Sequence, residues 1–399
     1  MTFAAGAQEQ IRLIEEVTEG TTPATDMKII PHSDVTGPSK EWDRGPTAEV
    51  ASDLQVQSNP VKGFSVAMSI STLLRYGIAD DLFELLCNST WSAAAAVTAQ
   101  TDVASVDTGN KFTSVTTDKF NAFAVGDVVY VFRDGSAPLD TWAEVTSVVT
   151  GASPELGINV NWIDLGDEAA GDSVTIMHSG QLTPGTTLAS ASIERAKTDI
   201  AQFMIGRGMK VSQLAFSASK GGDPTLAWTL MGLTKASAAT TFGTGTETAA
   251  AVNEVMNAGD GFQNFREADV VTANHIISQF NFTIGSPIGV IDAMGSLGAN
   301  SLIKNRYAVS GEYRLYTNDE ARTLAQKGEA DTASSVGCAF REANDGYYFH
   351  FPAIDYTSGD DDGSGNDNQI FTAMPWLAYK DGTNSRMFQI ARFTSIPTS

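Results

Sequence analysis

The chain has 399 residues, and 47 Asp and Glu against 25 Lys and Arg give it a formal net charge of −22. This excess of negative charge argues against a surface that binds the phosphates of nucleic acid. The apolar runs end within about ten residues, short of the roughly 20 that a membrane span needs. The length favours more than one domain, while 36 Gly residues and a charged fraction of only 18% are typical of a fold rich in strands and turns.

The first 60 residues are predicted to form a short helix and an extended arm. Residues 8–16 fit a helix, whereas residues 19–60 carry Pro and Gly throughout and show little periodicity. An arm of this kind is usually ordered by wrapping a neighbouring subunit or domain, which hints at assembly. Residues 1–10 lack the basic and apolar regions of a secretory signal, so we expect the protein to be made in a cytoplasm.

Residues 61–94 and 181–235 together are predicted to form a first body. Residues 61–72 alternate apolar and small polar side chains, as in Phe64, Val66 and Met68 against Ser65, Ala67 and Ser69, which predicts a half-buried strand. Residues 80–86 begin with two acids and continue with an apolar face at helical spacing, so a short helix is expected there. Long strands follow at residues 188–200, 203–219 and 223–231.

Residues 95–180 interrupt this pattern and are predicted to form an inserted small β domain. Short strands separated by turns are expected at residues 111–115, 127–132, 142–149, 157–162 and 173–177. These strands would make a small barrel or sandwich, which we expect to have closely spaced ends and its own small core.

After a linker over residues 236–269, residues 270–399 repeat the order of the first body. A strand is expected at residues 307–316 and a helix at 318–326, followed by strands at 333–341, 346–356, 369–379 and 386–393. The repeated order of strand, helix and strands suggests a divergent duplication. The predicted fold class is therefore mainly β with short helices, in two duplicated sandwich or barrel bodies.

The sequence argues against an enzyme. His32, His178, His275 and His350 stand apart from one another and from cysteine, and none lies in a metal-binding spacing, so neither a catalytic site, a metal nor a cofactor is predicted. Gly206-Arg207-Gly208 and Gly243-Thr244-Gly245 complete no phosphate-binding motif and are better explained as hairpin turns. Cys87 and Cys338 have no CxxC partner and are expected to be buried thiols.

Two further motifs have an ordinary explanation beside a functional one. The acidic run at residues 360–367 is similar to a calcium loop but lacks its spacing and its closing Glu, so a solvated hairpin tip is favoured. The aromatic strand with Tyr347, Tyr348, Phe349 and Phe351 has the side chains of a base-stacking platform, but an acidic chain lacks the basic groove that accompanies one. Packing in the core explains these aromatic residues better.

Long strands with open edges invite aggregation unless another subunit covers them. A closed ring in which strands continue from one protomer to the next removes these edges, and this arrangement suits the chain.

Several short motifs are distributed along most of the chain. They are EVTEGTTP at residues 16–23, SKEWDR at 39–44, DDLFELL at 80–86, NSTW at 88–91, ASIER at 191–195, GRGMKV at 206–211, WTLMG at 228–232, FPAI at 351–354 and FQIAR at 388–392. Together these motifs resemble those of one family of structural proteins, the tail tube proteins of long-tailed, non-contractile bacteriophages. Asn88 and Ser89 depart slightly from the family's turn, and residues 39–44 match its arm only loosely.

The resemblance implies a virion protein whose copies form stacked rings around a channel for genome passage, with the inserted domain as an outward decoration. The implied partners are further copies of the chain, in a ring that is trimeric with pseudo-sixfold symmetry or hexameric, together with tape measure and tail terminator or tip proteins. DNA would pass without specific binding, no membrane is involved, and assembly would take place in the host cytoplasm before the protein resides in the virion tail. The alternative is a secreted or cell-surface β-rich adhesion protein.

A channel formed by so acidic a chain is expected to be electronegative. Candidates for acids on inward strand faces are Glu194, Asp199, Glu312 and Glu342. Each is equally well explained as an ordinary solvated acid on a strand, because alternation alone does not say which face meets the channel.

Overall fold

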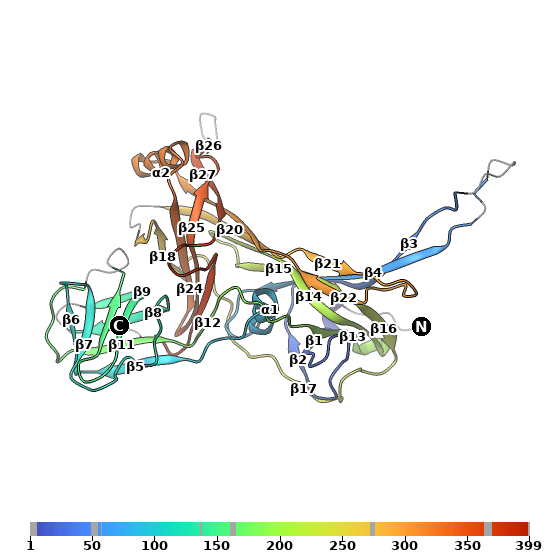
Figure 1. The fold of residues 1–399 in the computed structure, drawn as a ribbon, viewed down its shortest axis with the longest axis horizontal. Coiled ribbons are helices and arrows are strands. Elements are labelled where there is room, and N and C mark those ends of the chain that lie inside the picture. Colours follow the sequence, from blue (N-terminus) through green and yellow to red (C-terminus); the bar gives the residue numbers. More distant parts are fainter. Residues whose placement is uncertain are drawn as a thin grey trace.

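The computed structural model describes residues 6–48, 55–56, 58–135, 138–159, 165–271, 276–362 and 369–397. Most of the described residues in regular structure lie in strands, together with two α-helices and two short 3₁₀ turns, η1 (Gly6–Gln8) and η2 (Thr198–Ile200). Figure 1 shows a small domain at one end of the molecule beside the C-terminus, packed sheets in the middle, and a long hairpin that projects from the other end.

A central antiparallel sheet joins the two predicted bodies. Its strands follow the order β3-β4-β15-β14-β20-β23-β27. Apolar side chains alternate along these strands, so one face of the sheet packs against the core and the other is left to solvent. The strands are β3 (Asp34–Arg44), β4 (Val61–Leu73), β14 (Gln202–Ser219), β15 (Thr225–Gly232), β20 (Ile277–Gly285), β23 (Ala308–Tyr316) and β27 (Phe371–Ala378).

The first half of the chain adds an outer sheet, ordered β2-β1-β13-β14-β16. Strand β14 belongs to both sheets, because residues 202–209 pair with β13 and β16 whereas residues 210–219 pair with β15 and β20. Gly208 lies at the bend with φ +64°, and a Cβ there would come within 2.7 Å of Leu233, so glycine is required. The added strands are β1 (Glu9–Glu15), β2 (Met27–Ile30), β13 (Ala191–Lys197), β16 (Thr234–Ala238) and β17 (Glu247–Thr248), the last parallel to β2.

The second half adds an equivalent outer sheet, ordered β19-β18-β24-β25-β28-β12. The end of β25 and the short β26 leave this sheet and pair with β27 in the central one, just as β14 does in the first half. The strands are β12 (Gly180–Leu182), β18 (Phe262–Glu267), β19 (Val270–Val271), β24 (Ser334–Glu342), β25 (Asp345–Tyr356), β26 (Asp360–Asp362) and β28 (Gln389–Phe393).

The two halves therefore share one order of strand pairing. The first half pairs β1-β13-β14-β15-β4-β3, and the second pairs β18-β24-β25-β27-β23-β20. In each half a helix follows the strand in fifth place, α1 (Asp80–Cys87) after β4 and α2 (Asp319–Glu329) after β23. The order of strand, helix and strands predicted from the sequence is thus present in both halves.

Local signals mark both ends of α1 and the start of α2. Asp80 and Asp81 lie in the first turn of α1, which ends at Asn88 in the left-handed conformation with φ 52°. Asn318 caps α2 by accepting a hydrogen bond from the Ala321 backbone N at 2.7 Å. Between the sheets lies a shared aromatic core, in which the Phe216 and Phe282 rings stack with their centroids 4.7 Å apart.

Residues 95–178 form the inserted domain, which Figure 1 shows beside the outer sheet of the second half. Its entry and exit are adjacent, because Ser92 N donates to Gln181 O at 3.0 Å. It has its own core, and a second apolar cluster, with Trp142 of the insert stacked on Tyr348 of β25, fastens it to the second half. Its sheet has the order β5-β11-β8-β9-β10-β7-β6, with β5 (Ala95–Gln100), β6 (Val103–Val106), β7 (Lys111–Ser114), β8 (Val128–Asp134), β9 (Leu139–Val149), β10 (Glu155–Ile158) and β11 (Ser173–His178).

A small hairpin of β21 (Ile288–Ile291) and β22 (Ser301–Lys304) lies near the start of β4. The Leu297 carbonyl in its loop accepts a hydrogen bond from Phe64 N at 2.9 Å. It occupies the same place between β20 and β23 as the projecting connection between β3 and β4 in the first half.

Three expectations about the chain's local structure differ from the structure. The predicted helix at residues 8–16 is wrong, because this segment forms β1, held between β13 and β2, and pairing on both edges outweighs local helical propensity. The segment 19–60 is not an arm without partners of its own, since β2 and β3 pair within the chain. The linker 236–269 supplies β17 and β18.

Candidate functional site

The feature that sets the central sheet apart is its solvent-exposed surface, here called the open face. It is built from the residues that alternate with the core positions of the sheet. From β4 to β20 no residue on it is charged, whereas β23 contributes Glu312 and Arg314 and the edge strand β3 contributes Asp34, Glu41 and Asp43. The uncharged positions are Ser65, Ala67, Ser69 and Ser71 on β4, Thr225, Ala227, Thr229 and Met231 on β15, Gln213, Ala215, Ser217 and Ser219 on β14, and Gln279, Asn281 and Thr283 on β20.

This composition has a direct chemical meaning. Hydroxyl, amide and methyl groups are hydrated but offer no fixed charge to an ionic partner. The whole chain carries 47 acids, so their absence over four adjacent strands places the negative charge outside this part of the open face. From β4 to β20 the open face thus offers no cation that could bind phosphate.

Both ends of the central sheet carry strand edges that face solvent in the part of the chain that the structure describes. At one end β3 pairs only with β4. At the other end β27 is followed by the end of β25 and by β26, whose far side pairs with no described strand. Unpaired edges of this length expose backbone donors and acceptors that readily accept another chain.

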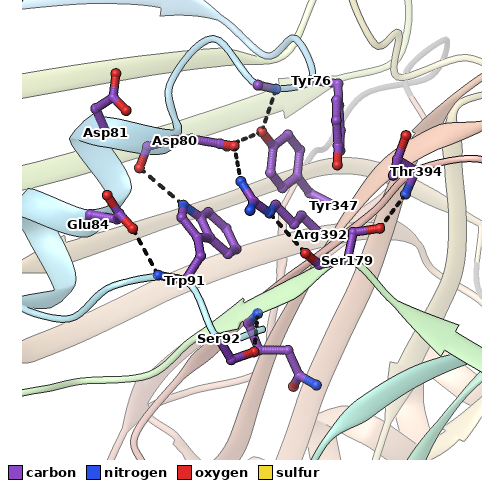
Figure 2. Close-up of polar contacts among 12 residues, drawn as sticks. Tyr76, Asp80, Asp81, Glu84, Trp91, Ser92, Ser179, Tyr347, Arg392 and Thr394 are labelled. Carbon is purple, nitrogen blue, oxygen red and sulfur yellow. Dashed lines mark hydrogen bonds and ion pairs between the residues drawn. The ribbon is translucent and has the colours of Figure 1, made fainter. Parts of the chain in front are cut away.

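A polar cluster joins the two halves beneath α1, and Figure 2 shows how its members converge on Asp80. The carboxylate of Asp80 accepts hydrogen bonds from Tyr347 Oη and from Arg392 Nη1, both at 2.5 Å. The Arg392 guanidinium lies 4.5 Å from the centre of the Trp91 ring, and burial raises the pKa of Tyr347. Gly77 N donates to the same Tyr347 hydroxyl at 2.9 Å, so these groups are committed to one another and the cluster acts as a structural connection.

The sequence predicts neither a catalytic site nor a metal site, and the placement of the described His and Cys residues bears on this prediction. Among them, no three His, Cys, Asp or Glu side chains are placed to hold a metal ion. His178 and His350 are buried beside Asp127 and Asp269 at 3.4 and 3.7 Å, His32 lies between β2 and β3, and His275 falls outside the described residues. Cys87 and Cys338 are fully buried as predicted, and burial raises the pKa of Cys87 to about 12.

The described residues line hollows of different sizes, among them one of about 980 Å³ beside Trp42, Phe64 and Leu297 and one of about 730 Å³ beside Asn318, Arg322 and Asp361. One cavity of about 200 Å³ lies between β1, β2 and α1 and is lined by Leu13, Glu15, Lys28 and Glu84 among others. It is smaller than the roughly 300 Å³ at which ligand pockets begin. None of the described helices is long and apolar enough to cross a membrane.

The structure does not bring the four acids proposed for a channel together. Glu194 is fully buried and bonded to Arg12, so it cannot serve as an exposed carboxylate, and this expectation is wrong for that residue. Asp199 lies in the turn η2, and Glu342 ends β24 in the outer sheet of the second half. Only Glu312 lies on the open face, on β23.

The residues that sequence reasoning missed are the uncharged ones. The alternation of Ser65, Ala67 and Ser69 with apolar neighbours was visible in the sequence and predicted a half-buried strand. The signal that was not used is the shared absence of charge at the same alternating positions of β14, β15 and β20.

Comparison with known protein families agrees with the architecture. Residues 6–376 match the phage tail tube protein family, and the chain belongs to this family. No curated protein matches the chain. Membership gives the protein a structural role in the bacteriophage tail, where it self-assembles into a tube and associates with other tail components. The resemblance stated from the sequence motifs is confirmed.

The structure covers the prediction for the aromatic strand fully and the prediction for the acidic run only in part. Tyr347, Tyr348, Phe349 and Phe351 are all at most 1% exposed, so they belong to the core as predicted. In the acidic run, Asp360–Asp362 forms β26, while residues 363–368 fall outside the described residues.

Proposed function

We propose that this chain is the major subunit of a tail tube and that its copies polymerise into stacked rings around a hollow channel for the genome. The observation that carries this proposal is the central sheet itself, which has one open face and, among the described residues, unpaired edges at both ends. A sheet of this kind closes when several copies join edge to edge into a barrel, and closure removes every exposed edge.

The open face would line the channel. Double-stranded DNA binds proteins chiefly through cations that neutralise its phosphates. A lining of hydroxyl, amide and methyl groups provides none from β4 to β20, so DNA would slide without being held. The net charge of −22 would act from other surfaces as a long-range repulsive field, weakened by salt. In this proposal the channel avoids adhesion mainly by lacking charge, with Glu312 as the acid candidate that remains on the lining.

The shared pairing order of the two halves supports an origin by duplication. Each chain would then supply two pseudo-equivalent sectors, and three chains would form a ring with pseudo-sixfold symmetry. The ring would be a trimer, and the inserted domain would lie on the outer wall, away from the open face. Strands β3 and β4 project from the body at their connected ends (Figure 1), and we place this hairpin between neighbouring subunits.

The further partners in this proposal are a tape measure protein inside the tube and terminator and tip proteins at its ends. Assembly in the host cytoplasm would precede residence in the virion tail, and DNA would pass without specific binding.

Electron microscopy of the purified full-length chain tests the proposal. We expect hollow tubes whose inner wall, in a cryo-EM reconstruction, is formed by β4, β14, β15, β20 and β23. A protein that stays monomeric at high concentration, or tubes whose inner wall is a different surface, would overturn it.

A further inference from the structure

The chain contains its own example of a joint between two equivalent units. Strands β14 and β20 belong to different halves, yet they pair antiparallel over seven residues, from Gln213 opposite Gly285 to Ser219 opposite Gln279. Within this joint, Ala215 lies opposite Thr283 and Ser217 lies opposite Asn281. Because the halves share one pairing order, this joint shows how the end of one unit accepts the start of the next.

The two halves can be aligned residue by residue through their longest common ladder. Strands β4 and β15 form eight pairs, from Val66 opposite Gly232 to Leu73 opposite Thr225. Strands β23 and β27 also form eight pairs, from Val309 opposite Ala378 to Tyr316 opposite Phe371. Buried and open positions alternate in the same phase in both ladders, so Val66 is equivalent to Val309.

The alignment extends to the strands on both sides of this ladder. The register between β14 and β15 shifts by one residue after Val211, and the register along β27 shifts by one residue between Tyr356 and Asp360. Ala215 opposite Ala227 therefore corresponds to Asp360 opposite Ala373. On the other side, Ser39 opposite Ala67 corresponds to Thr283 opposite Ser310.

Each half thus contains one segment equivalent to β14 and one equivalent to β20, the two strands of the internal joint. Counted from Ala215 and Asp360, the part of β14 that receives β20 begins at Gln213 and corresponds to the described residues from Ser358 to Asp362, which lead into and form β26. Strand β3 corresponds to β20. In the described chain neither segment has a strand on its outer side, so the joint is made once inside the chain and its two components are left unpaired at the ends of the sheet.

We propose that residues 358–362 of one copy pair antiparallel with β3 of a second copy, in the register of the internal joint. This register puts Asp360 opposite Ser39 and Asp362 opposite Thr36 of the neighbour. The inference rests on the proposed tube function and deepens it by naming the edges and the register of the contact between subunits.

The charges of the two edges predict how this contact responds to salt. Residues 360–362 are all Asp, and β3 carries Asp34, Glu41 and Asp43 against Lys40 and Arg44. Like charges brought onto adjacent strands oppose pairing, and salt screens them. The edges therefore resist association at low ionic strength, and raising the salt concentration lowers the protein concentration at which copies join.

A disulfide placed across the contact tests the proposal in assembled full-length protein. Asp360→Cys with Ser39→Cys is assembled under reducing conditions and then oxidised, and products are separated without reductant. We expect covalent oligomers that end at the number of chains in one ring. Ala215→Cys with Thr283→Cys is the matched control, which forms its disulfide within one chain, and the native Cys87 and Cys338 are fully buried and do not contribute.

The outcomes separate the register, the contact and the function. More efficient linking by Asp360→Cys with Glu41→Cys would overturn the register. Tubes that form, with the internal control linked but without links between copies, would overturn the contact and leave the tube function standing. A wild-type chain that forms no tubes would overturn both.

Hydrogen exchange of the unmodified protein gives an independent measurement in case the cysteine variants fail to assemble. Amides of residues 34–43 and 358–362 should gain protection when tubes form, whereas β13, which is already paired on both edges, should change little. No gain at either edge would overturn the proposed contact.

Discussion

Arg12 and Glu194 lie opposite each other on β1 and β13 and form a buried ion pair, with 3.1 Å between Arg12 Nη1 and Glu194 Oε1. Glu194 also accepts a hydrogen bond from Phe242 N at 2.7 Å, and Arg12 Nη1 lies 2.6 Å from Glu247 Oε1. The pair therefore connects the outer sheet of the first half to the segment that leads into the second half.

Replacing Glu194 tests this structural role. Glu194→Gln keeps the shape of the side chain but leaves the Arg12 charge with less compensation, and breaking a buried pair in this way costs about 3–5 kcal/mol. We expect a loss at the lower end of that range, because Glu247 remains beside Arg12. The measurement is the free energy of unfolding from urea titration.

Glu312→Gln on the open face is the matched control, and a half-buried acid away from a buried pair should change stability by less than about 0.5 kcal/mol. Equal losses from the two variants would contradict the assignment of Glu194 to a structural ion pair.

The same residue shows where sequence reasoning reaches its limit. The alternation around Val66 predicts a strand because one face of β4 is buried and the other is open. Both faces of strand β13 are buried from its start up to Glu194. The alternation of residue types therefore does not show which side of this strand meets solvent. The sequence predicts a helix in place of strand β1 for a similar reason. Its partners are β13, which lies far away in the sequence, and β2, which lies across a loop, and only this pairing distinguishes the segment from a helix.

The inserted domain can be excised to test its role. Its ends meet at Ser92 and Gln181, so a short Gly-Ser link can replace residues 94–179 without stretching the chain. The core of the second half remains, but Tyr348, Phe393 and Ile396 lose their cover. We therefore expect tubes that still form but associate side by side, and electron microscopy measures this bundling.

The excised chain carrying Phe393→Ser and Ile396→Ser provides the comparison, and it should return the tubes to separate particles. Loss of tube formation in both excised chains would show that the insert is needed for assembly and would contradict its proposed place on the outer wall.

Glu144 predicts a pH dependence for the docking of the insert. It lies on β9 at the contact with the second half and is 8% exposed, and burial raises its pKa. His350 and Arg386 oppose this shift, while Asp269 and Asp381 add to it. Because the pKa of the docked carboxyl lies above its ordinary value, ionisation opposes docking above the raised pKa and this penalty disappears as the pH falls below the ordinary value.

Glu144→Gln removes the ionisation. At pH 7.5 the variant should resist protease cleavage of the insert at least as well as the wild type, and the difference between them should shrink as the pH is lowered towards 4. A difference that is constant over this range would contradict a role for ionised Glu144, and cleavage of an unrelated unfolded protein corrects for the pH dependence of the protease.

The number of chains in a ring tests the proposed equivalence of the two halves. If each half supplies one sector, three chains close a ring of six sectors, and native mass spectrometry of rings released from tubes should give three times the mass of the 42.2 kDa chain. Six chains in a ring would contradict the use of the repeated pairing order as a guide to assembly, even though that order is present within the chain.

The open face can be tested by placing charge where it has none. Ser69, Ser217 and Thr229 lie on three different strands of this face and are all exposed. Changing all three to Lys places a positive cluster on the open face of every chain in the ring. Each new contact between a Lys and a phosphate raises the affinity for DNA. We expect tubes to form and DNA release to slow several-fold at low salt, with recovery as salt screens the contacts.

Two matched variants separate this effect from damage to the sheet. The same positions changed to Asp carry equal charge of the opposite sign and should leave the release rate close to that of the wild type. Thr323→Lys on the exposed side of α2 adds positive charge away from the open face and should also have no effect. Normal release at low salt from particles shown to carry the three Lys substitutions would mean that this face does not meet the DNA.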